Sequence, residues 1–112
     1  MKKFMVFYKA SEAEFARAMS ATPEQQKAMT EDWMAWSKTA GPAIVDMGAL
    51  LGKTLRVTAA GASPSRNDLG GYTIMQGESK EAIGEALKGH PHLKMGDNAS
   101  IEVVELIAIP GV

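Results

Sequence analysis

The chain has 112 residues and no cysteine, so it fits a single domain over residues 1–112 and excludes disulfides, thiolate metal sites and a cysteine nucleophile. Its formal net charge of −1, without a cluster of basic residues, argues against nucleic acid as a partner. No apolar stretch approaches the length of a membrane span, and the apolar run after Lys3 is too short for a signal peptide, so we expect a cytoplasmic protein that binds no membrane.

The first forty residues predict a strand followed by two helices. Residues 4–8 (FMVFY) are rich in aromatic and β-branched residues, which is typical of a strand. Ser11 stands three residues before Glu14, the capping-box pattern that begins a short helix. A longer helix begins at Thr22 and ends before Pro42, which cannot continue the hydrogen-bond ladder. Its apolar stripe has helical spacing and consists of Met29, Trp33, Trp36 and Ala40.

The middle of the chain predicts extended segments. Residues 43–52 (AIVDMGALLG) read as extended, with an interruption near Gly48, and residues 54–58 (TLRVT) alternate as a half-exposed strand does. Residues 59–71 (AAGASPSRNDLGG) are typical of a long polar loop. Residues 71–76 (GYTIMQ) predict a further strand.

A second helix and a last strand complete the pattern. Ser79 is a suitable N-cap, and Gly89 suits the left-handed position after the helix. Residues 101–109 (IEVVELIAI) predict the closing strand. The resulting order predicts an α+β fold of the ferredoxin-like, split βαβ type, in which a four-stranded antiparallel sheet carries both helices on one face.

The closing strand is apolar on both faces. One face carries Ile101, Val103, Ile107 and Ile109 around Glu105, and the other carries Val104, Leu106 and Ala108. Because two helices cover only one side of such a sheet, the other side needs another partner. We expect a symmetric homodimer whose two sheets face each other; the alternative is that the short helix of residues 11–20 folds under the sheet.

Two histidines flank Pro91 in the segment GHPHL, residues 89–93. Pro91 favours extended geometry at His90, and side chains two residues apart in an extended segment point to the same side. Three interpretations are open: loop residues at a helix end, an acid/base or ligand-contacting group at His90 or His92, or a metal site that would need a third ligand.

Four further residues are candidates for the same pocket. Asp46 lies in VDMG between apolar neighbours and could be the partner of a histidine, or an exposed strand-end carboxylate. Glu105 interrupts an apolar strand face, and Tyr72 offers a phenol. Arg56 could bind an anionic substrate. The chain has no glycine-rich phosphate loop and no nucleophile elbow, and packing accounts for its eight methionines, so we expect no cofactor and no metal.

Several segments together resemble the YCII-related family of small bacterial proteins. They run nearly from end to end of the chain: KKFMVFYKA, ATPEQQKAMTEDWMAW, VDMG, GGYTIMQGES, GHPHL and SIEVVELIAIPG. The resemblance implies a ferredoxin-like subunit that forms a dimeric α/β barrel. It also implies a pocket in which a histidine of GHPHL is paired with Asp46, because some members are proposed to use such a pair.

Two functions remain open from the sequence. In the first, the protein is a small-molecule enzyme of the lyase or hydrolase type, in which one histidine transfers protons, Asp46 orients it, and Tyr72, Glu105 and Arg56 contact the substrate. In the second, the same pocket binds a small molecule without turnover, as a binding or regulatory module.

Overall fold

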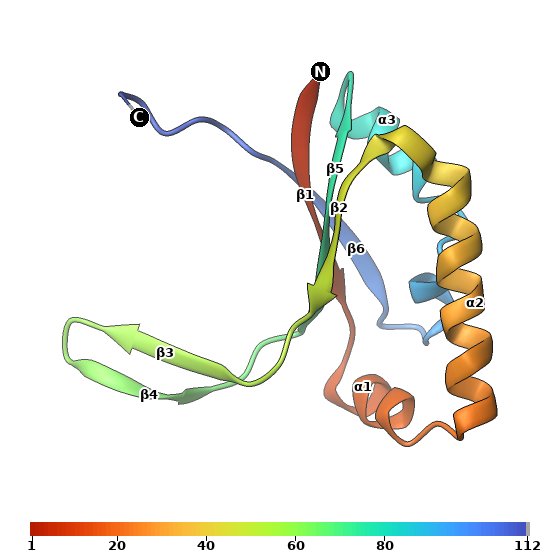
Figure 1. Ribbon diagram of the computed structural model, residues 1–112. Helices are drawn as coiled ribbons and strands as arrows, with labels where there is room; N and C mark the ends of the chain where they lie inside the picture. Colours follow the sequence, from red (N-terminus) through yellow and green to blue (C-terminus); the bar gives the residue numbers. More distant parts are fainter. Residues whose placement is uncertain (112) are drawn as a thin grey trace.

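The computed structural model describes residues 1–111 and has an α+β fold (Figure 1). Its elements, in chain order, are β1 (Lys2–Lys9), α1 (Glu12–Met19), α2 (Pro23–Ala40), η1 (Gly41–Ala43), β2 (Ile44–Leu50), β3 (Thr54–Thr58), β4 (Gly61–Ser65), β5 (Leu69–Gly77), α3 (Lys80–Ala86), η2 (Pro91–Lys94) and β6 (Ser100–Glu105), where η marks a 3-10 helix.

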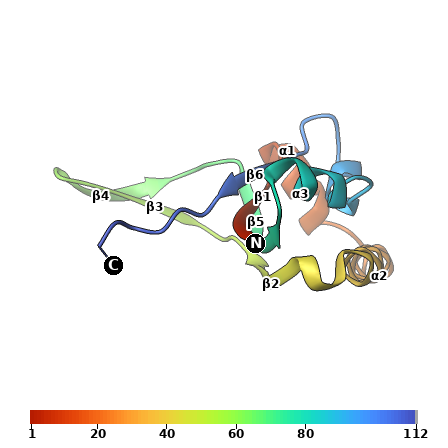
Figure 2. The same ribbon diagram turned by 90° about the horizontal axis from the view of Figure 1, so that it is seen from above.

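Four strands form one antiparallel sheet, in the order β2-β5-β1-β6, and β3 and β4 form a separate two-stranded hairpin. The three α-helices and η2 lie on one side of the four-stranded sheet (Figures 1 and 2). In residues 1–111, no helix covers the other side. We refer to that side as the uncovered face.

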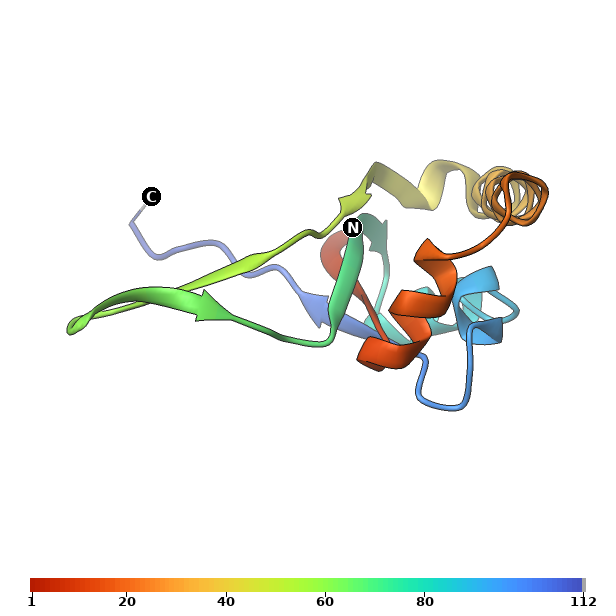
Figure 3. The ribbon, with the colours of Figure 1, turned by 90° about the horizontal axis from the view of Figure 1, so that it is seen from below.

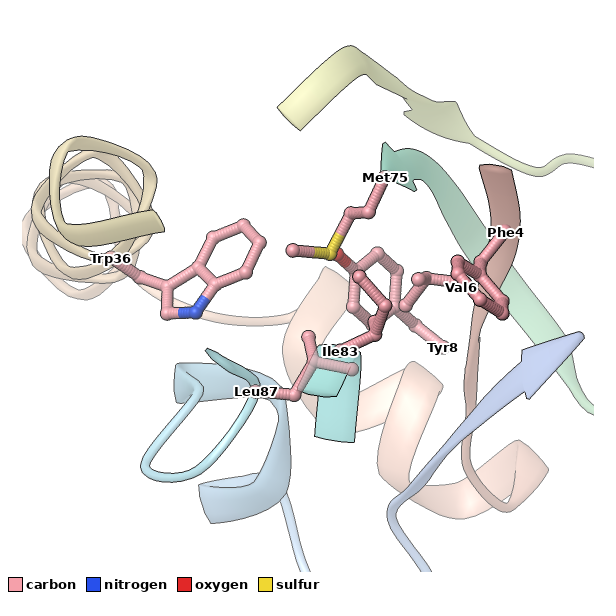
Figure 4. Packing of buried hydrophobic residues seen from close by; sticks show 7 residues of the cluster. All are labelled: Phe4, Val6, Tyr8, Trp36, Met75, Ile83 and Leu87. Atoms are coloured by element: carbon pink, nitrogen blue, oxygen red, sulfur yellow. The ribbon is translucent and has the colours of Figure 1, made fainter. Parts of the chain in front are cut away.

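Strand register assigns residues to the two faces. Phe4 lies opposite Met75, and Val6 lies opposite Thr73 and Val103. These positions, together with Tyr8, point toward the helices, since residues opposite each other share a face. The core between sheet and helices consists of Phe4, Val6, Tyr8, Trp36, Met75, Ile83 and Leu87 (Figure 4).

The uncovered face is apolar as well. Phe7 lies opposite Tyr72, and Met5 lies opposite both Ile74 and Val104. The first four of these side chains are half-buried, and Val104 is 48% exposed. The sheet therefore has two apolar faces, as the sequence predicts, and only one of them is covered.

Local signals predicted the helix ends correctly. Ser11 and Glu14 form the capping box of α1, and Thr22 caps α2 with Gln25 as its reciprocal partner. Ser79 accepts a hydrogen bond from the backbone N–H of Ala82 at the start of α3. These three caps confirm where the helices begin.

Two predictions about strands were wrong. Residues 59–71 are not a continuous loop, because β4 pairs with β3 across a tight turn at Gly61 (φ 139°). The closing strand ends at Glu105, not at residue 109, because the register places Glu105 opposite Phe4, so β1 has only two residues, Lys2 and Lys3, beyond this pair. The last hydrogen bond of this pairing is donated by the backbone N–H of Leu106 to the Lys3 carbonyl.

The molecule is more extended than a compact monomer of its length. Its radius of gyration is 15.6 Å, against about 13 Å for a compact 112-residue domain. Its accessible surface is 7900 Å², about 2,000 Å² more than is usual for a monomer of 11.9 kDa. The hairpin and the C-terminal residues project from the body and account for much of this shape (Figure 2). Within the described residues, no helix is long and apolar enough to cross a membrane.

Candidate functional site

The GHPHL segment turns from α3 back toward the sheet. Gly89 takes a positive φ of 73°, which confirms its predicted left-handed conformation. His90 is extended (φ −57°, ψ 136°), as a residue before proline should be. Pro91 does not end helical structure, however, because it occupies the first turn of η2, where its missing N–H costs nothing. His90 is therefore the N-cap of a new short helix.

The His90 imidazole is an unusual helix cap. Its Nδ1 accepts a hydrogen bond from the backbone N–H of His92 at 3.0 Å. An accepting Nδ1 carries no proton, so in the neutral ring the proton resides on Nε2. The backbone of η2 thereby selects the tautomer of His90.

Aromatic rings surround this imidazole, and we call the set of Tyr8, Trp33 and Trp36 the aromatic cage. Tyr8 stacks on His90 with ring centroids 5.0 Å apart. Trp33 and Trp36 meet the imidazole in T-shaped geometry at 4.5 Å and 4.4 Å. The cage thus connects β1, the second strand from the sheet edge, with two turns of α2. Trp36 points from α2 toward the sheet (Figure 4).

His90 is fully buried, and its Nε2 has no hydrogen-bond partner within residues 1–111. A buried N–H without an acceptor costs about 1–3 kcal/mol, and the aromatic π faces around it are only weak acceptors. Burial lowers the pKa of His90 from 6.5 to about 4, with a smaller effect from the neighbouring His92. At neutral pH the ring is therefore an uncharged donor held away from water.

His92 has a different environment. Its side chain is buried, and its Nε2 lies 2.8 Å from the backbone carbonyl oxygen of Lys9 at the end of β1. The carbonyl only accepts, so Nε2 of His92 is the donor. This hydrogen bond fixes η2 to the sheet, and it gives His92 a structural role beside the cage.

Tyr8 also lies in a fixed network. The hydroxyl of Thr73 donates to the Met47 carbonyl at 2.9 Å, so the Tyr8 hydroxyl, 2.7 Å from the Thr73 oxygen, is the donor in that pair. Burial raises the pKa of the Tyr8 phenol above its ordinary value, and the hydrogen bond to Thr73 opposes this rise. Tyr8 is therefore a neutral wall of the cage.

A groove of about 450 Å³ lies outside the cage, between α2 and the segment from α3 to η2. Its lining includes Trp36, Gly89 and Pro91, and the last two are the chain neighbours of His90. Its remaining lining residues include both charged and small side chains: Asp32, Ala35, Thr39, Ala40, Glu85, Ala86, Lys88 and Lys94. The groove therefore meets the cage at Trp36.

The structure does not bring Asp46 to the histidines. Asp46 is exposed, its Oδ1 accepts a hydrogen bond from the backbone N–H of Gly48 at 2.8 Å, and it lies opposite Ile74 in the sheet. Ile74 belongs to the uncovered face, so the sheet separates Asp46 from His90. The implied histidine–aspartate pair is not formed. Within residues 1–111, no three His, Asp or Glu side chains are grouped closely enough to hold a metal ion.

The other predicted residues also lie apart from the cage. Tyr72 belongs to the uncovered face, and Arg56 is exposed on the β3–β4 hairpin opposite Ser63. Glu105 lies at the end of the edge strand β6, exposed, with an oxygen 3.9 Å from the Lys2 ammonium. The proposed common pocket of all six residues therefore reduces to the two histidines.

Sequence reasoning missed the aromatic cage itself. The sequence predicts Trp33 and Trp36 as part of one apolar helix stripe and Tyr8 as part of the first strand, and neither pattern indicates a binding site. No local signal in the sequence marks the cage, because only the fold brings these side chains to GHPHL.

No family model matches the chain, and no curated protein was found to be similar to it. The resemblance to the YCII-related family therefore stays a prediction.

Proposed function

We propose that this protein is a homodimer that binds a small molecule at His90, with the aromatic cage as the wall of the site. The observation that carries this proposal is the Nε2–H of His90, a fully buried donor without an acceptor in the described part of the chain. Native proteins rarely leave such a group unsatisfied, and the exceptions occur at functional sites. A ligand oxygen would supply the missing acceptor.

The chemistry of the cage defines the class of ligand. A neutral imidazole N–H donates to a carbonyl, carboxylate or phenolate oxygen. Tyr8, Trp33 and Trp36 favour a flat, apolar body that stacks against them. We therefore propose a small aromatic or cyclic molecule with one acceptor oxygen, which approaches through the groove beside Trp36.

The state of the imidazole favours binding over catalysis. Nδ1 is occupied by the backbone N–H of His92, and Nε2 carries the proton, so the neutral ring has no free lone pair for a general base. Asp46, the residue expected to orient it, lies on the other face of the sheet. We propose the non-catalytic alternative for these reasons.

The homodimer is supported by the sheet. The strand order β2-β5-β1-β6, antiparallel throughout, is the one expected of a ferredoxin-like subunit, and no helix within residues 1–111 covers the apolar uncovered face. Two sheets packed face to face would form a dimeric α/β barrel. The ligand site lies on the helix side of each sheet, so each subunit carries one complete site.

Tryptophan fluorescence tests the ligand site, because both tryptophans of the chain belong to the cage. We expect benzoate, phenol or cyclohexanone to change this fluorescence saturably in the wild-type protein. His90→Asn preserves an acceptor for the His92 N–H but removes the Nε2 donor, and it should weaken binding at least about 10-fold. Arg56→Ala, on the distant hairpin, should bind as the wild type does.

Two outcomes of these binding measurements would contradict the proposal. Equal affinity of wild type and His90→Asn for every ligand that binds would exclude His90 as the anchor. Turnover of any of these compounds that His90→Asn abolishes would instead restore the enzymatic alternative.

A further inference from the structure

Two segments project from the same side of the molecule. The hairpin arm, residues 54–65, leaves the lower ends of β2 and β5, and the tail, residues 106–111, leaves the upper end of β6 (Figure 1). Seen from below, both extend away from the helices, toward the side of the uncovered face (Figure 3). They therefore flank that face at opposite ends.

The hairpin arm has one apolar face that is open to solvent. Leu55 lies opposite Pro64, and Val57 lies opposite Ala62, while Arg56 and its partner Ser63 belong to the other face. Leu55 is 62% exposed and Val57 is 73% exposed. An isolated two-stranded hairpin is marginally stable in water, so this arm needs a surface on which to pack.

The tail has the sequence of a strand but no partner strand. Leu106 makes the last hydrogen bond to β1, after which Ile107 and Ile109 are 80% and 70% exposed. An extended apolar segment with unpaired backbone groups can add as a strand to a sheet edge. Within residues 1–111, the tail adds to none.

The exposed area matches what one subunit buries in a stable dimer. The surface excess of about 2,000 Å² over a compact monomer exceeds the roughly 800 Å² that each partner buries in an interface of standard size. For two subunits the excess is about 4,000 Å², which falls within the range of about 2,000–5,000 Å² that obligate homodimers bury in total. A second copy of the chain has the same uncovered face, hairpin arm and tail, so the two copies can pack symmetrically about a two-fold axis.

We infer that the hairpin arm and the tail clasp a second copy of this chain: the apolar face of the arm packs on the partner, and the tail adds as a strand to an edge of the partner's sheet. This inference rests on the homodimer proposed above and assigns the segments that hold it together. In the dimer, each subunit contacts its partner with one hairpin arm and one tail.

Single lysine substitutions on the two faces of the arm test the first contact. Val57→Lys places a charge on the apolar face, and Ser63→Lys places the same charge on the polar face as a matched control. Both positions are exposed in one protomer, so both variants should fold with unchanged circular dichroism. We expect Val57→Lys, measured by sedimentation equilibrium, to raise the dimer dissociation constant at least about 30-fold, and Ser63→Lys to change it less than about 3-fold.

Amide hydrogen exchange tests the second contact. If the tail is an intermolecular strand, the amides of Ile107 and Ile109 should exchange at least about 100-fold more slowly than in an unstructured chain. Deletion of residues 107–112 should weaken the dimer to a similar extent as Val57→Lys.

The outcomes separate this inference from the proposed dimer. A wild-type chain that sediments as a monomer overturns both and leaves the arms to a different partner. A wild-type dimer that is unchanged by Val57→Lys and by the tail deletion, with unprotected tail amides, overturns only the inference about the arms.

Discussion

At the scale of single residues, His90 combines features that oppose stability. Its Nε2–H has no acceptor among residues 1–111, and its pKa of about 4 reflects surroundings that disfavour the charged ring. The cap that it provides to η2 offsets part of this cost. Such a balance is expected where a residue is retained for binding and not for folding.

We predict that His90 makes the protein less stable as the pH falls from about 6.5 to 4. In the unfolded chain His90 takes up a proton near pH 6.5, whereas in the folded chain it does so only near pH 4. Protonation therefore favours the unfolded chain in this window, and the free energy of unfolding falls as the pH falls. The stability is fully present above pH 6.5, and the loss approaches about 3 kcal/mol at pH 4. Urea unfolding at each pH measures it.

The variants His90→Asn and His90→Phe isolate this effect, because both keep His92 and every carboxylate. Their free energy of unfolding should fall less between pH 6.5 and 4.5 than that of the wild type. An identical pH dependence in all three proteins would show that His90 titrates normally.

A second prediction concerns the cost of the buried donor. His90→Phe removes a helix cap, at about 1 kcal/mol, but also removes an unsatisfied N–H worth about 1–3 kcal/mol. We expect its free energy of unfolding at pH 7 to equal that of the wild type or to exceed it by up to about 2 kcal/mol. Trp36→Ala, which opens a cavity in the core, should cost about 3–5 kcal/mol. Denaturant titrations measure the free energy of unfolding of both variants. A loss of stability in His90→Phe as large as in Trp36→Ala would contradict the claim that the His90 Nε2–H is buried without an acceptor.

At the scale of elements, β2 depends on one glycine. Gly48 has a φ of 79° in an irregular part of the ladder, and a Cβ there would collide with the backbone of Tyr72 on β5. We predict that Gly48→Ala lowers the free energy of unfolding by at least about 2 kcal/mol, because both the backbone conformation and the strand spacing resist it. Gly52→Ala, where nothing lies within 4 Å of the added Cβ, is the matched control and should cost less than about 1 kcal/mol. Thermal or urea unfolding measures both variants. Similar losses of stability in the two would show that the Tyr72 backbone does not lie close to Gly48.

The elements that the sequence predicted well are those with local signals. The caps at Ser11, Thr22 and Ser79 bind backbone groups within three residues, so their pattern is complete in a short window. The hairpin strand β4 was missed because Pro64 and its serine neighbours resemble a loop, and only pairing with β3 makes them a strand.

The site was predictable only in part for the same reason. His90 and His92 were recognisable by their chemistry, and their burial confirms that GHPHL is more than an exposed helix end. Tyr8 and Trp33 join them through contacts between β1, α2 and η2, far apart in the sequence, which no local pattern reveals. Asp46 was predicted to pair with a histidine from its apolar neighbours and from the resemblance, but strand register places it on the opposite face.

At the scale of the whole molecule, the apolar uncovered face predicts association. Ile74 lies on that face, half-buried, between Met5 and Asp46. We predict that Ile74→Lys converts a dimer of twice 11.9 kDa into monomers at micromolar concentration, as measured by sedimentation equilibrium. Asp97→Lys, at an exposed loop position on the helix side, should remain dimeric. Association of Ile74→Lys as tight as that of the wild type would place the interface elsewhere.

The binding role of His90 is tested most directly by nuclear magnetic resonance of its two imidazole nitrogens at pH 7, with and without benzoate, phenol or cyclohexanone. We predict an unprotonated Nδ1 and a protonated Nε2 in the free protein, and a downfield shift of the Nε2 proton when one of these ligands supplies its acceptor oxygen. A proton on Nδ1, or an Nε2 resonance that stays unchanged while a ligand saturates the protein, would contradict the proposed site.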